Sequence, residues 1–145
     1  MGYESYYGVA QDDLKYLEYS ISVIDGAPVF NNLLIQEQQI CEKMLKELVH
    51  RFVFTENVQS ILKSHKLITL VNAVQDYTGW KLQLDLSRLR ILSDFYFDGR
   101  DPSVDFLLAT KEDALFGYET VQQVVTAVNR MIAEYVPKTK ILDSF

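Results

Sequence analysis

The chain has 145 residues, with 14 basic and 20 acidic side chains, so its formal net charge at pH 7 is −6. A chain of this length is expected to form one domain with a single core. The excess of acidic residues excludes a broad basic surface for binding nucleic acid. No apolar run approaches the roughly 20 residues of a membrane-spanning helix. The sequence starts without a leader pattern, and its one cysteine cannot form an internal disulfide, so we expect a cytoplasmic protein.

Residues that break regular structure are few, with 6 Gly and 3 Pro, and most of them occur in clusters. A β-sandwich or barrel needs turn signals every ~8–12 residues, whereas the uninterrupted segments here run for about 20 residues or more. The spacing therefore predicts an all-α fold, an up-and-down bundle of four or five helices. We expect a single domain over residues 1–136, followed by a tail over residues 137–145.

Apolar side chains repeat at steps of three and four along the chain. The repeats predict helices over residues 6–24, 29–54, 64–78 and 82–97, with a short helical turn near 58–62. Polar residues at 36–39 interrupt the stripe of the second helix. Ser64 is the expected N-cap of the third helix, and Gly79 is expected to end it.

The fourth predicted helix, over residues 82–97, is apolar on more than one side. This is typical of a helix that is central or that contacts a second chain. The last helix is expected to start at Thr110, which forms an approximate capping box with Asp113, and to end before Pro137.

The sequence offers little catalytic chemistry. It contains no GxSxG, Walker or GxGxxG motif. Cys41 lies in an apolar helical stripe, where a thiol is typically buried and inert. His50 and His65 lack the spacing of helical zinc motifs, so we expect His50 to interact with a helix end and His65 to brace a helix corner. No catalytic residue, metal or cofactor is predicted.

Two pairs of opposite charge lie four residues apart on the second predicted helix, Glu42 with Lys46 and Lys43 with Glu47. Such pairs on a helix surface contribute ~0.2–0.5 kcal/mol each. The first interpretation is therefore helix support on a solvated face. The alternative is a polar strip beside a binding groove.

The segment over residues 98–103 is predicted to be a loop and is the strongest candidate for ligand binding. Arg100 lies there between two aspartates, directly after the aromatic run Phe95-Tyr96-Phe97. A guanidinium can bind phosphate or carboxylate in a bidentate manner, with aromatic faces available for a base. It can equally tie the loop down by pairing with a neighbouring acid.

Three stretches, in this order, resemble motifs of the HEPN domain family (higher eukaryotes and prokaryotes nucleotide-binding). Residues 39–48 are similar to its helix pattern around Glu-Lys-x-x-Lys, and residues 64–70 to its Thr/Ser-His-x-Leu-x-x-Leu helix start. Residues 89–102 are similar to its Leu-x-x-x-Tyr segment ending in Arg-Tyr-Pro, with Asp101 in place of the usual Tyr. The resemblance covers about residues 5–135, and it extends to the helical domain of kanamycin nucleotidyltransferase.

The resemblance implies a helical bundle that is commonly a dimer and is often encoded beside a minimal nucleotidyltransferase. Many relatives are ribonucleases or toxins that use an Arg-x(4–6)-His motif. In this sequence no histidine follows Arg100, and neither His50 nor His65 has an arginine at the required spacing before it. The acid–base group of that cleavage is therefore missing.

We accordingly predict a noncatalytic binding module, a homodimer that binds a nucleotide or a nucleotidyltransferase partner. The expected ligand contacts are Arg100, Tyr96, Lys43 and Lys46. The alternatives are a divergent HEPN ribonuclease or toxin and a purely structural interaction protein.

Overall fold

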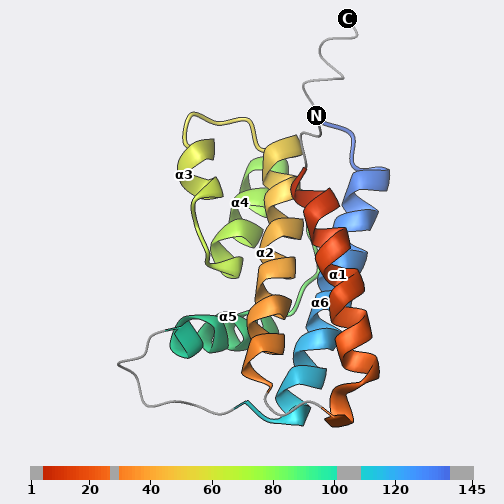
Figure 1. Ribbon diagram of the computed structural model, residues 1–145. Helices are drawn as coiled ribbons and strands as arrows, with labels where there is room; N and C mark the ends of the chain where they lie inside the picture. Colours follow the sequence, from red (N-terminus) through yellow and green to blue (C-terminus); the bar gives the residue numbers. More distant parts are fainter. Residues whose placement is uncertain (1–4, 27–29, 101–108, 138–145) are drawn as a thin grey trace, which may run out of the picture.

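The computed structural model describes residues 5–26, 30–100 and 109–137, with residues 96–100 described by their backbone alone (Figure 1). These residues form helices and contain no strand, which confirms the all-α prediction. The helices are α1 (Tyr6–Ser22), α2 (Asn31–Phe52), α3 (Val58–Leu62), α4 (Leu67–Thr78), α5 (Leu86–Arg100) and α6 (Lys111–Glu134), with a 3-10 turn at Ile24–Gly26. In the described part of the chain, no helix has the length and apolar character needed to span a membrane.

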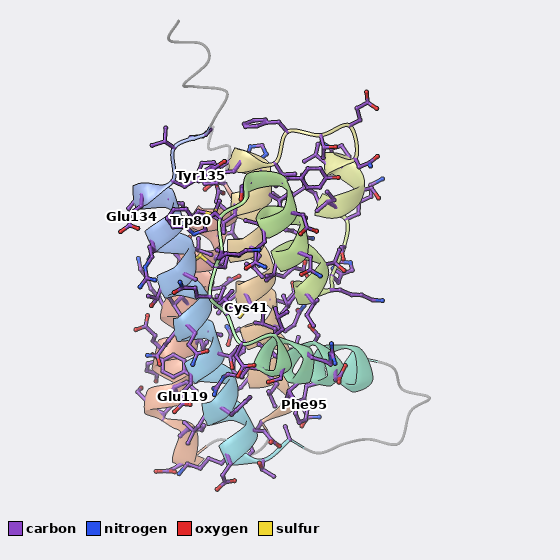
Figure 2. The ribbon with its side chains drawn as sticks, turned by 180° about the vertical axis from the view of Figure 1, so that it is seen from behind. Cys41, Trp80, Phe95, Glu119, Glu134 and Tyr135 are labelled. Atoms are coloured by element: carbon purple, nitrogen blue, oxygen red, sulfur yellow. The ribbon has the colours of Figure 1, made fainter. Side chains whose placement is uncertain are left out.

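Helix α2 is the centre of the bundle, since every other helix contacts it. Helices α1 and α6 pack along one side of α2, α4 packs on the other side, and α5 lies across the bundle (Figure 1). Helices α2, α4 and α6 run in the same direction. Between α2 and α4 the chain passes through α3. Between α4 and α6 it passes through the non-helical segment over residues 80–85, which is visible from behind in Figure 2, and then through α5.

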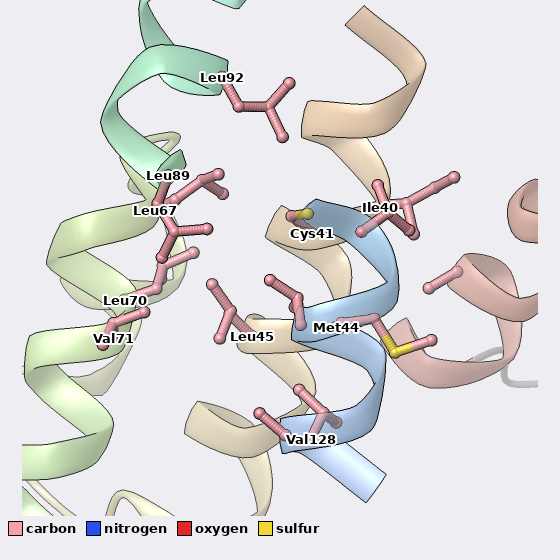
Figure 3. Packing of buried hydrophobic residues seen from close by; sticks show 14 of the residues in the cluster. Ile40, Cys41, Met44, Leu45, Leu67, Leu70, Val71, Leu89, Leu92 and Val128 are labelled. Carbon is pink, nitrogen blue, oxygen red and sulfur yellow. The ribbon is translucent and has the colours of Figure 1, made fainter. Parts of the chain in front are cut away.

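The core is formed where α2 meets its neighbours (Figure 3). Apolar side chains from four helices are fully or almost fully buried there, among them Ile40, Met44, Leu45, Leu67, Leu70, Leu89, Leu92 and Val128. Burial of each such side chain contributes about 1.5–3 kcal/mol before the entropic cost of folding. Because α2 is covered on so many sides, its polar residues are drawn into the interior as well.

Several predicted boundaries are confirmed. Gly79 ends α4 in the left-handed conformation, with φ of 77°, which glycine adopts without steric cost. The capping box at the start of α6 is present: Asp113 N–H donates to Thr110 Oγ1 at 3.1 Å, and Thr110 N–H donates to Asp113 Oδ2 at 2.9 Å. The short helix α3 also lies where the sequence predicts it.

Two predicted helix starts are wrong. Helix α4 begins after Lys66, while Ser64 Oγ accepts a hydrogen bond from Lys66 N–H at 3.1 Å in the turn before it. Helix α5 begins at Leu86, since the chain before it is the non-helical connection in which Leu82 is buried. The apolar pattern predicts Leu82 in the helix because a buried leucine of a non-helical segment fits a helical stripe equally well.

The loop predicted over residues 98–103 is also corrected, because α5 continues through Arg100. The turn signals at Gly99 and Pro102 do not prevent residues 98–100 from being helical. Residues 101–103 lie outside the described part.

Candidate functional site

The structure places two of the four predicted ligand contacts, Lys43 and Lys46, beside carboxylates. Lys43 Nζ donates to Asp13 Oδ2 of α1 at 2.6 Å, and Lys46 Nζ donates to Glu42 Oε2 at 3.0 Å. The two ammonium groups are therefore directed to different neighbours, and each is already paired with a negative charge.

The other two predicted contacts, Tyr96 and Arg100, both belong to α5. They lie four residues apart, a spacing that places both on one face of the helix. Their side chains lie outside the described part of the structure. Their predicted joint contact with a ligand stays a prediction.

The two predicted charge pairs on α2 have different outcomes. The Glu42–Lys46 pair forms, but with side chains only 6% and 8% exposed it is buried rather than part of a solvated face. The Lys43–Glu47 pair does not form, because Glu47 Oε2 accepts from Arg51 Nε at 2.6 Å while Lys43 reaches α1. Local spacing favours both pairs equally, and packing against the neighbouring helices decides between them.

The buried pair belongs to a larger group, the Glu42 cluster, formed by Gln38, Glu42, Lys46 and His65. Gln38 Nε2 donates to Glu42 Oε1 at 3.3 Å and to the His65 carbonyl at 2.9 Å. His65 Nδ1 lies 3.2 Å from both oxygens of Glu42. The carboxylate thus has three donor side chains around it, which offsets the cost of burying its charge.

The Glu42 cluster joins α2 to the corner between α3 and α4. This confirms the brace predicted for His65. A histidine oriented by a carboxylate is also the arrangement used for proton transfer in general acid–base catalysis. Here Lys46 neutralises the same carboxylate, so the immediate effect of the cluster is to fix the start of α4 against α2.

A second polar residue of α2, Glu37, is fully buried, and neither of its carboxyl oxygens has a hydrogen-bond partner among the residues that the structure describes. Gly117 of α6 packs directly against it, and a Cβ atom added at Gly117 would lie 2.1 Å from Glu37 Oε1. Burial raises the pKa of Glu37 from 4.5 to about 9. The group is therefore a neutral carboxylic acid at pH 7, held in a slot that the missing side chain of Gly117 leaves open.

Cys41 lies one helical turn after Glu37 and is fully buried, as predicted. Burial raises the pKa of its thiol, and the carboxylate of the neighbouring Glu37, once ionised at high pH, raises it further. A thiol with a raised pKa and no solvent access is a poor nucleophile. Cys41 thus acts as a small apolar side chain of the core.

A surface hollow lies at the end of the bundle where α2, α4 and α6 finish. We call it the aromatic groove and define it by Phe52, Phe54, Tyr77, Tyr135 and Pro137. The groove has two adjacent parts, with volumes of about 340 Å³ and 450 Å³, and four of these five residues line both parts.

Two aromatic rings of the groove are held by contacts with other rings, and two are exposed to solvent. Phe52 meets Tyr135 edge to face at 5.1 Å between ring centroids. Trp80 also meets Tyr135 edge to face, at 5.9 Å, and the two lie next to each other in Figure 2. In contrast, Phe54 is 67% exposed and Tyr77 is 52% exposed. Exposed apolar side chains gathered in one hollow are typical of an interaction site. Helical periodicity does not indicate this site, because it assigns Phe54 and Tyr135 to the predicted helices, whereas both follow the last residues of α2 and α6.

The groove has a negative bias on the side formed by α4 and α6. Asp76 lines this side, and the C-termini of both helices, each with a partial charge of about −0.5, end beside it. Neither helix has a basic residue in its last turn. On the α2 side, His50 and Arg51 line the second part of the groove, and Arg51 is paired with Glu47. An apolar occupant that carries positive charge therefore matches the side of the groove formed by α4 and α6.

A family model of the HEPN domain matches residues 3–131 of the chain. The chain belongs to the HEPN domain family. The match confirms the resemblance seen in the sequence, and it includes the Glu42 cluster and the contact between Glu37 and Gly117. Searches of curated proteins and of solved structures give no match.

The matched part of this HEPN domain ends before the last groove residues, Tyr135 and Pro137. The groove therefore combines two segments inside the family match, at the ends of α2 and α4, with one segment beyond it.

Proposed function

We propose that this HEPN domain is a noncatalytic binding module that docks a partner protein in the aromatic groove. The observation that carries the proposal is the exposure of Phe54 and Tyr77 in a hollow formed by three helix ends. The pairing of Lys43 and Lys46 with carboxylates supports a protein partner over a nucleotide, because neither ammonium is available without breaking an ion pair. A minimal nucleotidyltransferase is the partner that the family resemblance suggests.

We expect Phe54→Asp to weaken partner binding by about tenfold or more, since exposed aromatic anchors dominate the energetics of such interfaces. The measurement is calorimetric titration with a minimal nucleotidyltransferase. Tyr16→Asp is the matched control, because Tyr16 is 71% exposed on α1 and lies outside the groove. Unchanged affinity in Phe54→Asp, or an equal loss in the control, would count against the groove.

We also propose that the module is a dimer that associates through α5. Leu86 and Ile91 of α5 are exposed, and an apolar residue left in water is stabilised by a second chain. We expect light scattering at micromolar concentration to give about twice the chain mass of 16.8 kDa, and Ile91→Asp to give the monomer. A monomeric wild-type chain would refute the dimer and leave the groove proposal standing.

Two alternatives have their own tests. Calorimetric titration with nucleoside triphosphates would favour a nucleotide ligand if heat appeared and Arg100→Ala abolished it. The ribonuclease alternative draws support from the contact between Glu42 and His65. RNA cleavage that is lost in His65→Ala would establish it.

A further inference from the structure

We propose that residues 138–145 of the same chain dock back into the aromatic groove and compete there with the partner. The competition rests on the proposed function, whereas the docking itself is independent of it. The segment begins directly after Pro137, which lines both parts of the groove. No intervening chain therefore separates this segment from the groove.

The composition of the segment complements the groove. Its sequence is Lys-Thr-Lys-Ile-Leu-Asp-Ser-Phe, which places two lysines next to Pro137 and three large apolar residues beyond them. The lysines match Asp76 and the uncompensated C-termini of α4 and α6. The apolar residues match Phe54 and Tyr77, whose rings are otherwise exposed to water.

The segment is long enough to reach across the aromatic groove from Pro137. Eight extended residues span up to about 29 Å, and Tyr77 lines the same part of the groove as Pro137. Attachment to the groove wall also gives the segment an effective concentration on the order of millimolar. Weak contacts are then enough for occupancy, and a partner that binds the groove must displace the segment.

A spin label on Ser144→Cys tests the docking in the full chain. The label reacts at one position, because the native Cys41 is fully buried. We expect the label to broaden the amide signals of Phe54, Tyr77 and Gly79 in NMR spectra. The same label in a Phe54→Asp chain gives the matched reference, and we expect the broadening of Tyr77 and Gly79 to fall there by at least half. Circular dichroism checks that this variant is folded, as expected for an exposed position.

Charge reversal of Lys138 and Lys140 to Glu in the labelled chain is expected to reduce the broadening as well. Equal broadening in the wild-type, Phe54→Asp and charge-reversed chains would overturn the docking. A mixture of labelled chain with isotope-enriched, unlabelled chain detects a second copy as occupant. Broadening in that mixture would place the segment on another molecule and would also overturn the proposal.

Calorimetric titration with the partner distinguishes a failure of the docking inference from a failure of the proposed function. If the segment docks and competes, the charge-reversed chain binds the partner more tightly than wild type. If the segment does not dock but Phe54→Asp still loses the partner, only the inference fails. If the segment docks and Phe54→Asp leaves partner binding unchanged, the proposed function fails and the docking stands.

Discussion

Replacing Glu42 with alanine is expected to lower the free energy of unfolding by about 3–5 kcal/mol, because it leaves the buried ammonium of Lys46 without its counter-charge. Gln38 and His65 lose their shared acceptor at the same time. Urea denaturation at pH 7 measures the loss. A cost below about 1 kcal/mol would show that the cluster contributes little to stability.

The double variant Glu42→Met with Lys46→Met separates the cost of an orphaned charge from the contribution of the pair itself. Well-packed apolar side chains often replace a buried ion pair without loss, so we expect the double variant to be more stable than Glu42→Ala. The exposed pair between Lys111 and Asp25 is the control. Asp25 is almost fully solvated, so we expect Asp25→Ala to change stability by no more than about 1 kcal/mol.

The second large effect is a dependence of stability on pH caused by Glu37. In the folded protein its pKa is raised to about 9, against 4.5 when it is exposed, so folding favours the protonated form. Its contribution is complete below pH 4.5 and is lost as the pH rises toward 9, because the unfolded chain ionises first. The slope between these limits is at most about 1.4 kcal/mol per pH unit.

Glu37→Met should remove that slope and raise the stability at neutral pH, since it replaces an unpartnered polar group with an apolar one of similar size. The measurement compares urea unfolding of wild type and variant at pH 5, 7 and 8.5, so that titration of all other groups cancels in the difference. Parallel curves for the two proteins would show that Glu37 titrates normally and is not isolated from water.

Substitutions at Gly117 test independently whether the Glu37 side chain occupies the slot. Gly117→Ala alone should destabilise the fold, because its Cβ would overlap the Glu37 carboxyl. In a Glu37→Ala background the same change should stabilise, since alanine is favoured over glycine inside a helix by roughly 1 kcal/mol. A destabilisation of equal size in both backgrounds would show that something other than Glu37 fills the slot.

The sequence predicts the parts of this fold that depend on local chemistry. Gly79 ends a helix because of its own backbone freedom, and Thr110 with Asp113 starts one through two hydrogen bonds that neighbouring residues make. Cys41 is correctly placed in the core, because it lies on a regular apolar stripe. Each of these outcomes requires only a few adjacent residues.

The parts that the sequence does not predict depend on how many neighbours a helix has. The polar run over residues 36–39 is expected to interrupt a buried stripe, yet Glu37 and Gln38 are fully buried because α2 is covered by helices on most of its surface. Likewise, the large apolar Leu115 of α6 is partly exposed, while the smaller Gly117 is buried. The size and polarity of a residue on one helix do not show how much space the neighbouring helix leaves for its side chain.

The shared direction of α2, α4 and α6 has a consequence for how recognition can diversify. The rim of the groove is made by the segments that follow these three helices, and Phe54, Gly79 and Pro137 all lie past the last helical residue. Lengthening or shortening those segments would reshape the proposed docking surface without changing the helices that form the core. On that proposal, a scaffold of this kind can exchange one binding specificity for another at its edge alone.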